Sequence, residues 1–476
     1  MRRPAHREKM SRASVTVGIE ALGLAIPLRR LSGQLLRENW GSGGAGTRAV
    51  AGPDQDVVTL AVDAAFDTGA VPSDALVRVF LGSTTAPLED GGNANQLAVA
   101  CDAVEAVEVT EIAGSLGSGA QALRAGCDAV RGRGGRALVA VAEVQSPAPG
   151  GANEGQLGDG GVAIVLGAEP RLGEVVAHAS LVSGTRERWR RRGERVTGEA
   201  DRPFAQEHGS PAAMRALAKR VLAAHQLDAQ HVRFALAAPD RATDPALRKS
   251  LGVPVDRIVP DATLDAVGAW GAAAFALALG RGLAACQPGD WLLVLGASAG
   301  AEALLVRAGE EAPTLAARLA AALAPSRAIP RYPQYLRIKG WLEGERIDPW
   351  TSPAVLARDE RALVRWRGSR CRSCGAIELP PKPVCHACDG REFGEVALAR
   401  TGAIVTFTAD HLVPNPDPPT IMVAADLDGG GRYYAELVDA DRSRVAIGQR
   451  VALTFRRIHE GGGFPNYGWK LRPVTA

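Results

Sequence analysis

From about Val15 to Arg307, short runs of Val, Ile and Leu alternate with longer Ala-rich stretches. The runs RVFLGST, RALVAVAEV and WLLVLGAS are continuously apolar, which is typical of strands buried on both faces. The stretches DVVTLAVDAAFDTG and PAAMRALAKRVLAAHQL repeat their apolar positions at helical spacing. Because strands alternate with helices, the pattern predicts a layered α/β domain.

This region consists of two halves of similar pattern. GGVAIVLGAEP closes the first half and AEALLVRAGEE closes the second in nearly the same way, which indicates an internal duplication. We expect the halves at residues 14–168 and 169–310. The most apolar tract, residues 266–280, is too short and too rich in glycine to span a bilayer, so it predicts a buried helix.

The pattern changes after residue 310. Ala-rich helices and a passage with Pro and Trp predict a helical linker arm over residues 311–365. A cysteine-rich segment follows at residues 366–394, and residues 395–476 contain five short alternating runs separated by Gly or Asp/Asn turns. The runs are GAIVTFTADH, TIMVAADLD, RYYAELVD, QRVALTFRRI and GWKLRPV. They predict a small β-barrel.

Four of the seven cysteines form two CxxC pairs with ten residues between them, in CRSCGAIELPPKPVCHACDG. They are Cys371, Cys374, Cys385 and Cys388. Each pair lets two thiolates reach one ion from a tight turn, and four thiolates match a closed tetrahedral zinc site. Because no ligand position is left open, we expect a structural zinc; the alternative is a metal-free relic. His386, inside the second pair, is interpreted as a bystander.

Composition and charge exclude few functions. The net charge of +3 is too weak to indicate nucleic-acid binding by its field alone, and the predicted barrel strands carry several acids, so we do not expect a nucleic-acid partner. Glu20 interrupts the only apolar run near the basic N-terminus, so we expect neither a signal peptide nor membrane association. The clustered cysteines suit a reducing compartment, and we expect a cytoplasmic protein.

Two sets of motifs resemble known families. GSRCRSCGAIELPPKPVCHACDG, TGAIVTFTADH and GFPNYGWKLRPV resemble the zinc-ribbon/OB-fold proteins that accompany acyl-CoA thiolases. The passages VGIEALGLAIPLRRL, RAVAGPDQDVVTLAVDAA, FLGSTTAP, GDGGVAIVLG and LDAVGAWGAAA resemble the thiolase superfamily, nearest to its hydroxymethylglutaryl-CoA synthase and ketoacyl synthase III branch.

The resemblance implies a duplicated α/β/α/β/α layered domain, followed by a rubredoxin-like zinc ribbon and a small OB-fold barrel. It implies a homodimer formed through the thiolase-like domain. It also implies acyl-thioester substrates, carried on coenzyme A or on an acyl carrier protein. In this family, a cysteine at a helix N-terminus takes the acyl group, and a histidine and an asparagine stabilise the enolate or oxyanion.

The residues that match the family's catalytic positions cannot perform this chemistry. Leu116 matches the cysteine, Ala237 the histidine and Ala269 the asparagine, and Thr84 matches a glutamate of the synthase branch. The expected triad is therefore absent.

Ser115, beside the matched cysteine position, has two interpretations. It is a helix N-cap or spacer, or it is a catalytic nucleophile. A nucleophile needs a base within about 3 Å, and His231 starts the strand that ends near Ala237, so it lies at the wrong end. Gly117 and Gly119 are candidate substrate-binding residues, since they leave backbone N–H groups free at a helix start.

Three other features are open to interpretation. Six arginines between Thr185 and Arg195 fit the phosphates of coenzyme A, with Arg190 and Arg192 as candidate substrate-binding residues, or they form a solvated loop. Cys127 is interpreted as a buried core residue. Asp159, in GDGG, is interpreted as the anchor of a turn through Asx bonding.

These observations favour an acyl-thioester enzyme of thiolase type without the usual Cys-His-Asn triad, with acyltransferase, condensation or retro-aldol chemistry in secondary or lipid metabolism. Retro-aldol cleavage needs a base and an oxyanion site but no acyl-enzyme. The alternative is a non-catalytic thioester-binding scaffold that partners an active thiolase or synthase. A serine acyltransferase that uses Ser115 is the third hypothesis.

Overall fold

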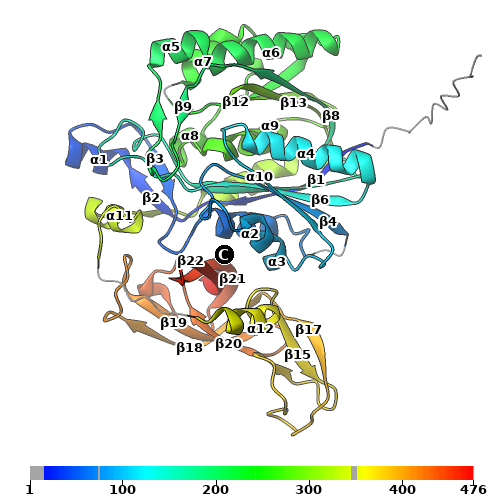
Figure 1. The fold of residues 1–476 in the computed structure, drawn as a ribbon, viewed down its shortest axis with the longest axis vertical. Helices are drawn as coiled ribbons and strands as arrows, with labels where there is room; N and C mark the ends of the chain where they lie inside the picture. Colours follow the sequence, from blue (N-terminus) through cyan, green and yellow to red (C-terminus); the bar gives the residue numbers. More distant parts are fainter. Residues whose placement is uncertain (1–15, 73–74, 242, 345–350, 475–476) are drawn as a thin grey trace, which may run out of the picture.

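The computed structural model of the chain describes residues 16–72, 75–241, 243–344 and 351–474 (Figure 1). The expected start of the first half at residue 14 and the expected end of the last domain at residue 476 lie outside the described residues. Part of the expected linker arm, residues 345–350, lies outside them as well.

Nine strands of the first domain form one mixed sheet in the order β11-β12-β13-β8-β1-β7-β6-β4-β5. The strands of the first half are β1 (Gly18–Ala25), β4 (Leu76–Gly82), β5 (Glu108–Ile112), β6 (Arg136–Glu143) and β7 (Gly160–Gly167). Those of the second half are β8 (Gly173–Val182), β11 (Val232–Ala237), β12 (Trp291–Ser298) and β13 (Gly300–Ala308). Smaller sheets contain β2 (Arg29–Ser32), β3 (Thr47–Val50) and β14 (Arg327–Ala328), and β9 (Arg188–Trp189) with β10 (Gly198–Glu199).

The sheet repeats one arrangement on either side of the contact between β1 and β8. Moving outward, β1-β7-β6-β4 corresponds to β8-β13-β12-β11. Within these two sets of four strands, the outer pairs β4/β6 and β11/β12 are parallel and the other pairs are antiparallel. A single bridge between Phe234 and Ile258 takes the place that β5 has in the first half. The topology confirms the predicted duplication.

The helices supply the remaining layers. They are α1 (Gly33–Trp40), α2 (Val57–Asp67), α3 (Asn93–Ala100), α4 (Ser118–Arg133), α5 (Arg202–His208), α6 (Ser210–Ala224), α7 (Asp244–Leu251), α8 (Thr263–Ala266), α9 (Ala274–Ala284), α10 (Leu315–Leu323), α11 (Tyr332–Ile338) and α12 (Pro353–Leu363). Helix α2 packs on β1, β6 and β7, α4 and α9 lie together between the two halves of the sheet, and α6 covers β12 and β13. This confirms the α/β/α/β/α layering. No helix among the described residues is both long and apolar enough to cross a membrane.

The two central helices differ in polarity, because α9 is covered on nearly all sides and α4 keeps an exposed polar face. Helix α9 is buried along nearly its whole length, as its continuous apolar sequence predicts. Cys127 of α4 is fully buried in the same central core, which confirms its interpretation as a packing residue. Burial raises the pKa of the Cys127 thiol to about 12, so this cysteine stays protonated and unreactive near neutral pH.

The C-terminal part contains two further sheets. The ribbon has β15 (Arg367–Cys371), β16 (Ile377–Glu378) and β17 (Phe393–Ala397). The second sheet has β18 (Thr401–Asp410), β19 (Thr420–Leu427), β20 (Arg432–Glu436), β21 (Arg450–Gly461) and β22 (Phe464–Pro473), in the order β20-β19-β18-β21-β22. A bridge between Leu437 and Leu471 brings the two ends of this sheet together, as expected for the predicted small barrel.

The OB-fold sheet docks on α2 of the first domain (Figure 1). The ring of Trp469 meets Phe66 edge-on at 5.5 Å. Within the same interface, Lys470 Nζ lies 3.0 Å from a carboxylate oxygen of Asp54. Burial alone would raise the pKa of Asp54, but Lys470 and Arg456 hold it well below its ordinary value. The carboxylate is therefore charged and paired inside the domain interface.

Candidate active site and metal centre

The N-terminus of α4 is packed against two turns of the second half. A Cβ at Gly119 would lie 2.3 Å from the carbonyl oxygen of Ala272. A Cβ at Gly117 would lie 2.7 Å from the Cβ of Ser298, at the end of β12. Only glycine permits these two approaches without movement of the backbone. We call residues 115–119, together with the turns they contact, the α4 mouth.

Of the residues matched to the catalytic cysteine, histidine and asparagine, Leu116 and Ala269 lie on or next to the segments that form this region, and Ala237 lies beside Gly296 on the neighbouring strand. Leu116 is half-buried and directly precedes the first turn of α4. Ala237 is the last residue of β11, and Ala269 precedes the short 3₁₀ turn that leads into α9; both are buried. Hydrophobic side chains therefore occupy the three positions that the sequence analysis matched to a nucleophile, a base and an oxyanion donor.

Ser115 is engaged by its own turn. Its hydroxyl accepts a hydrogen bond from the N–H of Gly117 at 3.2 Å, and its carbonyl accepts one from the Ser118 hydroxyl at 2.6 Å. The N-cap of α4 is Gly117, so the interpretation of Ser115 as the N-cap is wrong by two positions, although its hydroxyl does bind a backbone N–H. The bond also shows that the N–H of Gly117 is occupied, whereas we expected it to be free.

None of the described histidines makes a hydrogen bond to Ser115. His231 precedes β11, at the opposite end from Ala237, as its sequence position predicts. His178 is half-buried on β8, where desolvation and the charges of Arg131 and Arg124 lower its pKa to about 3. His208 lies on the surface helix α5 against Phe204. The structure therefore gives Ser115 no general base of the histidine type.

A buried carboxyl group that the sequence reasoning missed lies at the end of β6. Glu143 is fully buried and accepts hydrogen bonds from the N–H of Thr84 at 2.7 Å and from the hydroxyl of Thr85 at 2.7 Å. Burial raises the pKa of Glu143, and these bonds oppose the shift only in part. Gly271, at φ +52°, leaves room for the carboxyl group, since a Cβ there would lie 3.3 Å from the Glu143 Cγ.

A second carboxyl group lies beside the α4 mouth. Glu302, on β13, is 7% exposed, and its Oε1 accepts a hydrogen bond from the Gln121 side chain at 3.4 Å. Burial raises the pKa of Glu302. Glu302 is therefore a titratable group next to the start of α4, close to where the family's catalytic cysteine would be expected.

A cavity of about 270 Å³ adjoins this region. Its polar wall residues are Thr84, Thr85, Gln145, Ser146, Asn153, Arg188, Arg190, Thr197 and Glu199, and Leu157 and Val196 contribute to its apolar wall. The side-chain amide of Gln145 donates to the carbonyl oxygen of Ala269 at 2.8 Å, which joins the cavity wall to the turn at the α4 mouth. The cavity is large enough for an acyl group or the end of a pantetheine arm, but not for a whole coenzyme.

The arginine-rich segment divides between the cavity and the solvent. Arg188 lies in the wall with a side chain 13% exposed; its Nε is 3.5 Å from Glu199, and its Nη1 is buried without a hydrogen-bond partner among the described residues. Arg190 also lines the cavity and donates to the carbonyl oxygen of Thr84. Arg192 points away, with a side chain 87% exposed that pairs with Glu89 at 2.9 Å. Of the two predicted residues, the structure brings only Arg190 to the cavity.

Asp159 stabilises this site in a different way from the predicted Asx turn. It is buried and accepts hydrogen bonds from the N–H groups of Gln145, at 2.8 Å, and Ala51, at 2.7 Å. Its second oxygen also lies 3.0 Å from Lys339 Nζ. Asp159 thus ties three distant segments together behind the cavity.

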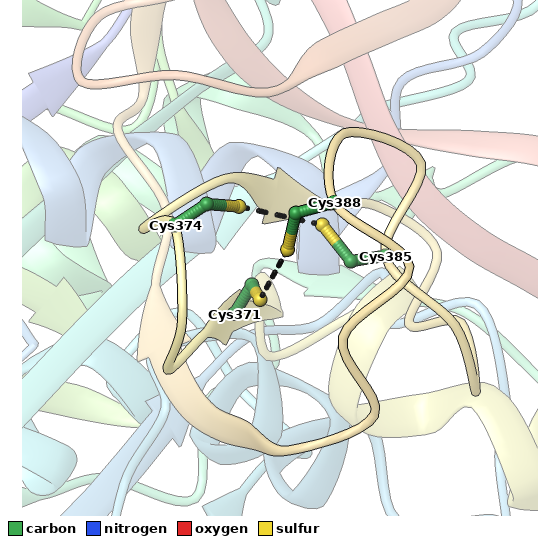
Figure 2. A group of neighbouring side chains, drawn as sticks. All are labelled: Cys371, Cys374, Cys385 and Cys388. Carbon is green, nitrogen blue, oxygen red and sulfur yellow. Dashed lines mark hydrogen bonds between the residues drawn. The ribbon is translucent and has the colours of Figure 1, made fainter.

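The four predicted metal ligands converge in the ribbon (Figure 2). The sulfur atoms of Cys371, Cys374, Cys385 and Cys388 all lie within 4.8 Å of one another. The Cys371–Cys388 and Cys374–Cys385 sulfur distances are 3.6 and 3.5 Å, close to the edge of about 3.8 Å that four Zn–S bonds of about 2.3 Å would give. The residues therefore fit a tetrahedral zinc ion.

Two similar turns produce this convergence. In the first turn the N–H of Gly375 donates to the carbonyl oxygen of Cys371 at 3.0 Å, and in the second the N–H of Asp389 donates to that of Cys385 at 3.1 Å. Gly375 and Asp389 have φ values of +79° and +59°, which explains the turn-forming residues after each pair.

His386 is tied to a neighbouring acid. Its Nδ1 lies 2.5 Å from Glu378 Oε1, which also accepts the backbone N–H of His386 at 2.9 Å. His386 is not part of the four-sulfur group, although its ring, Glu378 and Cys385 form a second set of neighbouring ligand atoms. Its position fits the interpretation as a bystander beside the cluster.

The two carboxyl groups that the sequence reasoning missed could have been found from the sequence, because each lies in an apolar run. Glu143 ends the run RALVAVAE, and Glu302 interrupts the apolar run GAEALLV. A lone acid in a strand that is otherwise buried costs free energy unless it is protonated or hydrogen-bonded, so its presence marks a special environment. Arg188 was one of six arginines, and nothing in the sequence distinguished it from Arg192.

Comparison with known proteins agrees with this geometry. The model of the ChsH2 rubredoxin-like zinc ribbon domain matches residues 358–394, and the model of the ChsH2 C-terminal OB-fold domain matches residues 395–456. A hydroxymethylglutaryl-CoA synthase from Thermococcus gammatolerans is 25% identical over 322 residues, which cover 63% of this chain and 88% of that protein. A solved structure of HMG-CoA synthase complexed with CoA superposes with a TM-score of 0.62 and 16% identity, over 70% of this chain and 92% of that one. The first domain has the thiolase-like fold, and the predicted fusion of the two resemblances is confirmed.

The C-terminal part allows a closer assignment. A DUF35 domain-containing scaffold protein from Methanocaldococcus jannaschii is 31% identical over 134 residues, which cover 25% of this chain and 95% of that protein. Over the quarter of the chain that this match covers, the protein belongs to the family of DUF35 domain-containing proteins.

Proposed function

We propose that this protein binds acyl thioesters without forming an acyl-enzyme, and serves as a scaffold for a separate active thiolase or synthase. The observation that carries the proposal is the set of Leu116, Ala237 and Ala269 on the segments around the α4 mouth. At these three matched positions the family's cysteine, histidine and asparagine are missing together, while the fold and the glycines that shape the mouth are present. The name of the M. jannaschii relative, a scaffold protein, supports the same role.

The cavity supports a thioester ligand that carries negative charge near its entrance. Arg188 presents a buried guanidinium nitrogen without a partner, and a phosphate or carboxylate oxygen would satisfy it. The pantetheine phosphate of coenzyme A or of an acyl carrier protein supplies such an oxygen. Dimerisation through the thiolase-like domain stays a prediction.

The four cysteines of the ribbon support a structural zinc ion. The ion would hold the two turns together and leave no coordination position for a substrate. The ribbon would therefore stabilise the C-terminal part, and the chemistry of a bound thioester would belong to the partner.

Calorimetric titration with acetyl-CoA, combined with intact mass spectrometry, tests the proposal. We expect saturable binding to the full chain and no mass increase. Arg188→Met should weaken binding at least tenfold, because it removes a cation from the cavity wall. The matched control is Arg191→Met on the same segment, whose side chain is 82% exposed, and it should change affinity less than threefold. An acyl adduct that Ser115→Ala abolishes would contradict the proposal.

Glu302 favours a second function. A buried carboxyl group with a raised pKa beside the α4 mouth is suited to general acid–base catalysis, which retro-aldol cleavage of a β-hydroxyacyl thioester requires. Incubation of the protein with a β-hydroxyacyl-CoA and detection of the released carbonyl compound tests it. Turnover that Glu302→Gln reduces at least a hundredfold would establish the enzyme, and binding without turnover would leave the scaffold role.

A further inference from the structure

The segment that links the two parts of the chain contacts three residues that lie next to or behind the cavity wall, namely Glu154, Arg195 and Asp159. This segment, α11 with the turn that follows it (residues 332–341), is called the α11 segment here. The Tyr332 hydroxyl donates to Glu154 Oε1 at 2.7 Å, next to the wall residue Asn153. Arg195, in the loop whose neighbours Val196 and Thr197 line the cavity, donates to the carbonyl oxygen of Lys339 at 2.7 Å.

The third contact is a buried ion pair. Lys339 Nζ lies 3.0 Å from Asp159 Oδ2, and the two side chains are 6% and 4% exposed. The same carboxylate holds the backbone of Gln145, and the Gln145 side chain lines the cavity. Removal of the Lys339 ammonium would leave a buried carboxylate without a counter-charge behind the cavity wall, and such a site rearranges or takes up water.

The α11 segment also contacts the OB-fold part. The side-chain amide of Gln334 donates to Asp417 Oδ1 at 3.1 Å, in the loop between β18 and β19. The other carboxylate oxygen of Asp417 accepts hydrogen bonds from Arg327 and from Nε of Arg29, the latter at 3.0 Å. One short helix is thus fixed at the same time to the cavity and to the docked C-terminal sheet.

We infer that the α11 segment couples docking of the OB-fold part to ligand binding in the cavity, with Lys339 as a positioning residue. The inference rests on the proposed function, because it assumes that the cavity is the thioester site. The segment holds Gln145 and the loop around Arg195 in the geometry that receives the ligand. Loss of its contact on either side lowers affinity, although neither Lys339 nor Asp417 is a wall residue of the cavity. By linkage, bound ligand strengthens the contact of the α11 segment with the OB-fold part by the same factor.

The test is the affinity of the full chain for acetyl-CoA in three variants. Lys339→Met removes the charge behind the cavity, and Asp417→Asn weakens the contact on the OB-fold side. We expect the dissociation constant to rise about tenfold in the first and at least threefold in the second. Lys470→Met is the matched control, because it removes another buried ammonium, paired with Asp54 and Glu436 in the same interface, without touching the α11 segment. Its affinity should stay within twofold of the wild type.

Urea unfolding of each variant shows whether Lys339→Met and Lys470→Met lose comparable stability. A rise in the dissociation constant that is equal in these two variants would mean general destabilisation and would overturn the inference. An unchanged affinity in both Lys339→Met and Asp417→Asn would overturn it as well. If Lys339→Met does not fold, Asp417→Asn alone decides. Failure of the wild type to bind acetyl-CoA is a different result, because it contradicts the proposed function itself.

Discussion

The α4 mouth and the four-cysteine cluster of the ribbon differ in which part of a functional site is present. The α4 mouth has the backbone shape, and the ribbon has the reactive side chains. At the α4 mouth the backbone is retained, with Gly117 and Gly119 packed closely against the second half, but the reactive side chains are replaced by hydrophobic ones. In the ribbon, all four thiols are present and their sulfur atoms converge. Under the proposed function, the first site acts through its shape and the second through its ligand chemistry.

The largest effect is expected in the ribbon. Cys371→Ser should abolish stoichiometric zinc and unfold residues 366–394, because structural zinc in small ribbons contributes about 10 kcal/mol or more to folding. Elemental analysis and circular dichroism of the purified chain measure both losses. Cys127→Ala, in the core of α4, is the control and should keep its zinc. Full zinc content in Cys371→Ser would show that the cluster is not the metal site.

The next effect tests whether the shape of the α4 mouth is under constraint. Gly119→Ala should destabilise the first domain by about 2–3 kcal/mol, because the new Cβ would overlap the carbonyl oxygen of Ala272. Gly132→Ala, on the same helix with no atom within 4 Å of the added Cβ, should instead stabilise it by about 0.5–1 kcal/mol. Chemical denaturation measures both variants. Equal changes in the free energy of unfolding in the two variants would mean that the close approach of Gly119 to Ala272 does not constrain the fold.

The pH dependence of stability should distinguish Glu143, whose pKa is raised, from Asp54 in the domain interface, whose pKa is lowered. The pKa of Glu143 is raised in the folded state, so its stabilising contribution is complete below its unfolded pKa near 4.5 and is lost as the pH rises toward the folded pKa. Glu143→Gln cannot ionise and keeps an acceptor for the Thr84 N–H. We expect the wild type to lose stability relative to this variant between pH 5 and 8, at up to about 1.4 kcal/mol per pH unit. A constant difference in urea midpoints over this range would contradict the prediction.

The smallest effect concerns the two arginines singled out by the sequence. Arg190→Ala should weaken acetyl-CoA binding about threefold to tenfold, since its side chain borders the cavity and holds the Thr84 carbonyl. Arg192→Ala should change neither affinity nor stability by more than about 0.5 kcal/mol, because its ion pair is exposed to solvent. Titration calorimetry with both variants compares them. A larger loss of affinity in Arg192→Ala than in Arg190→Ala would indicate that the ligand enters on the outer side of the loop.

The sequence predicted most of the fold because the signals for it are local. Continuous apolar runs identified β4, β6 and β12; the bounds of β12 coincide with the predicted run, and those of β4 and β6 differ from it by at most two residues. The β21–β22 hairpin is longer than predicted, since β21 continues to Gly461 and β22 begins at Phe464. Its polar outer residues dock against the loop before α2, which no local pattern reveals.

The candidate site was predicted in part. The inert positions Leu116, Ala237 and Ala269 could be identified from motif spacing, and the structure finds them at the ends of the expected elements. The carboxyl groups of Glu143 and Glu302 were missed, because their raised pKa depends on burial by segments far away in the sequence. The role of Asp159 was assigned wrongly for the same reason: its partners are Ala51, Gln145 and Lys339, not its own turn.

The sequence by itself determined the duplicated sheet, the order of the parts and the four metal ligands, because hydropathy periods and CxxC spacing act over a few residues. Only the tertiary structure decided which arginine faces the cavity, which acids are buried and how the α11 segment connects the cavity to the docked OB-fold sheet. These features depend on contacts between segments that are distant along the chain. Burial and electrostatic pairing arise only when those segments come together.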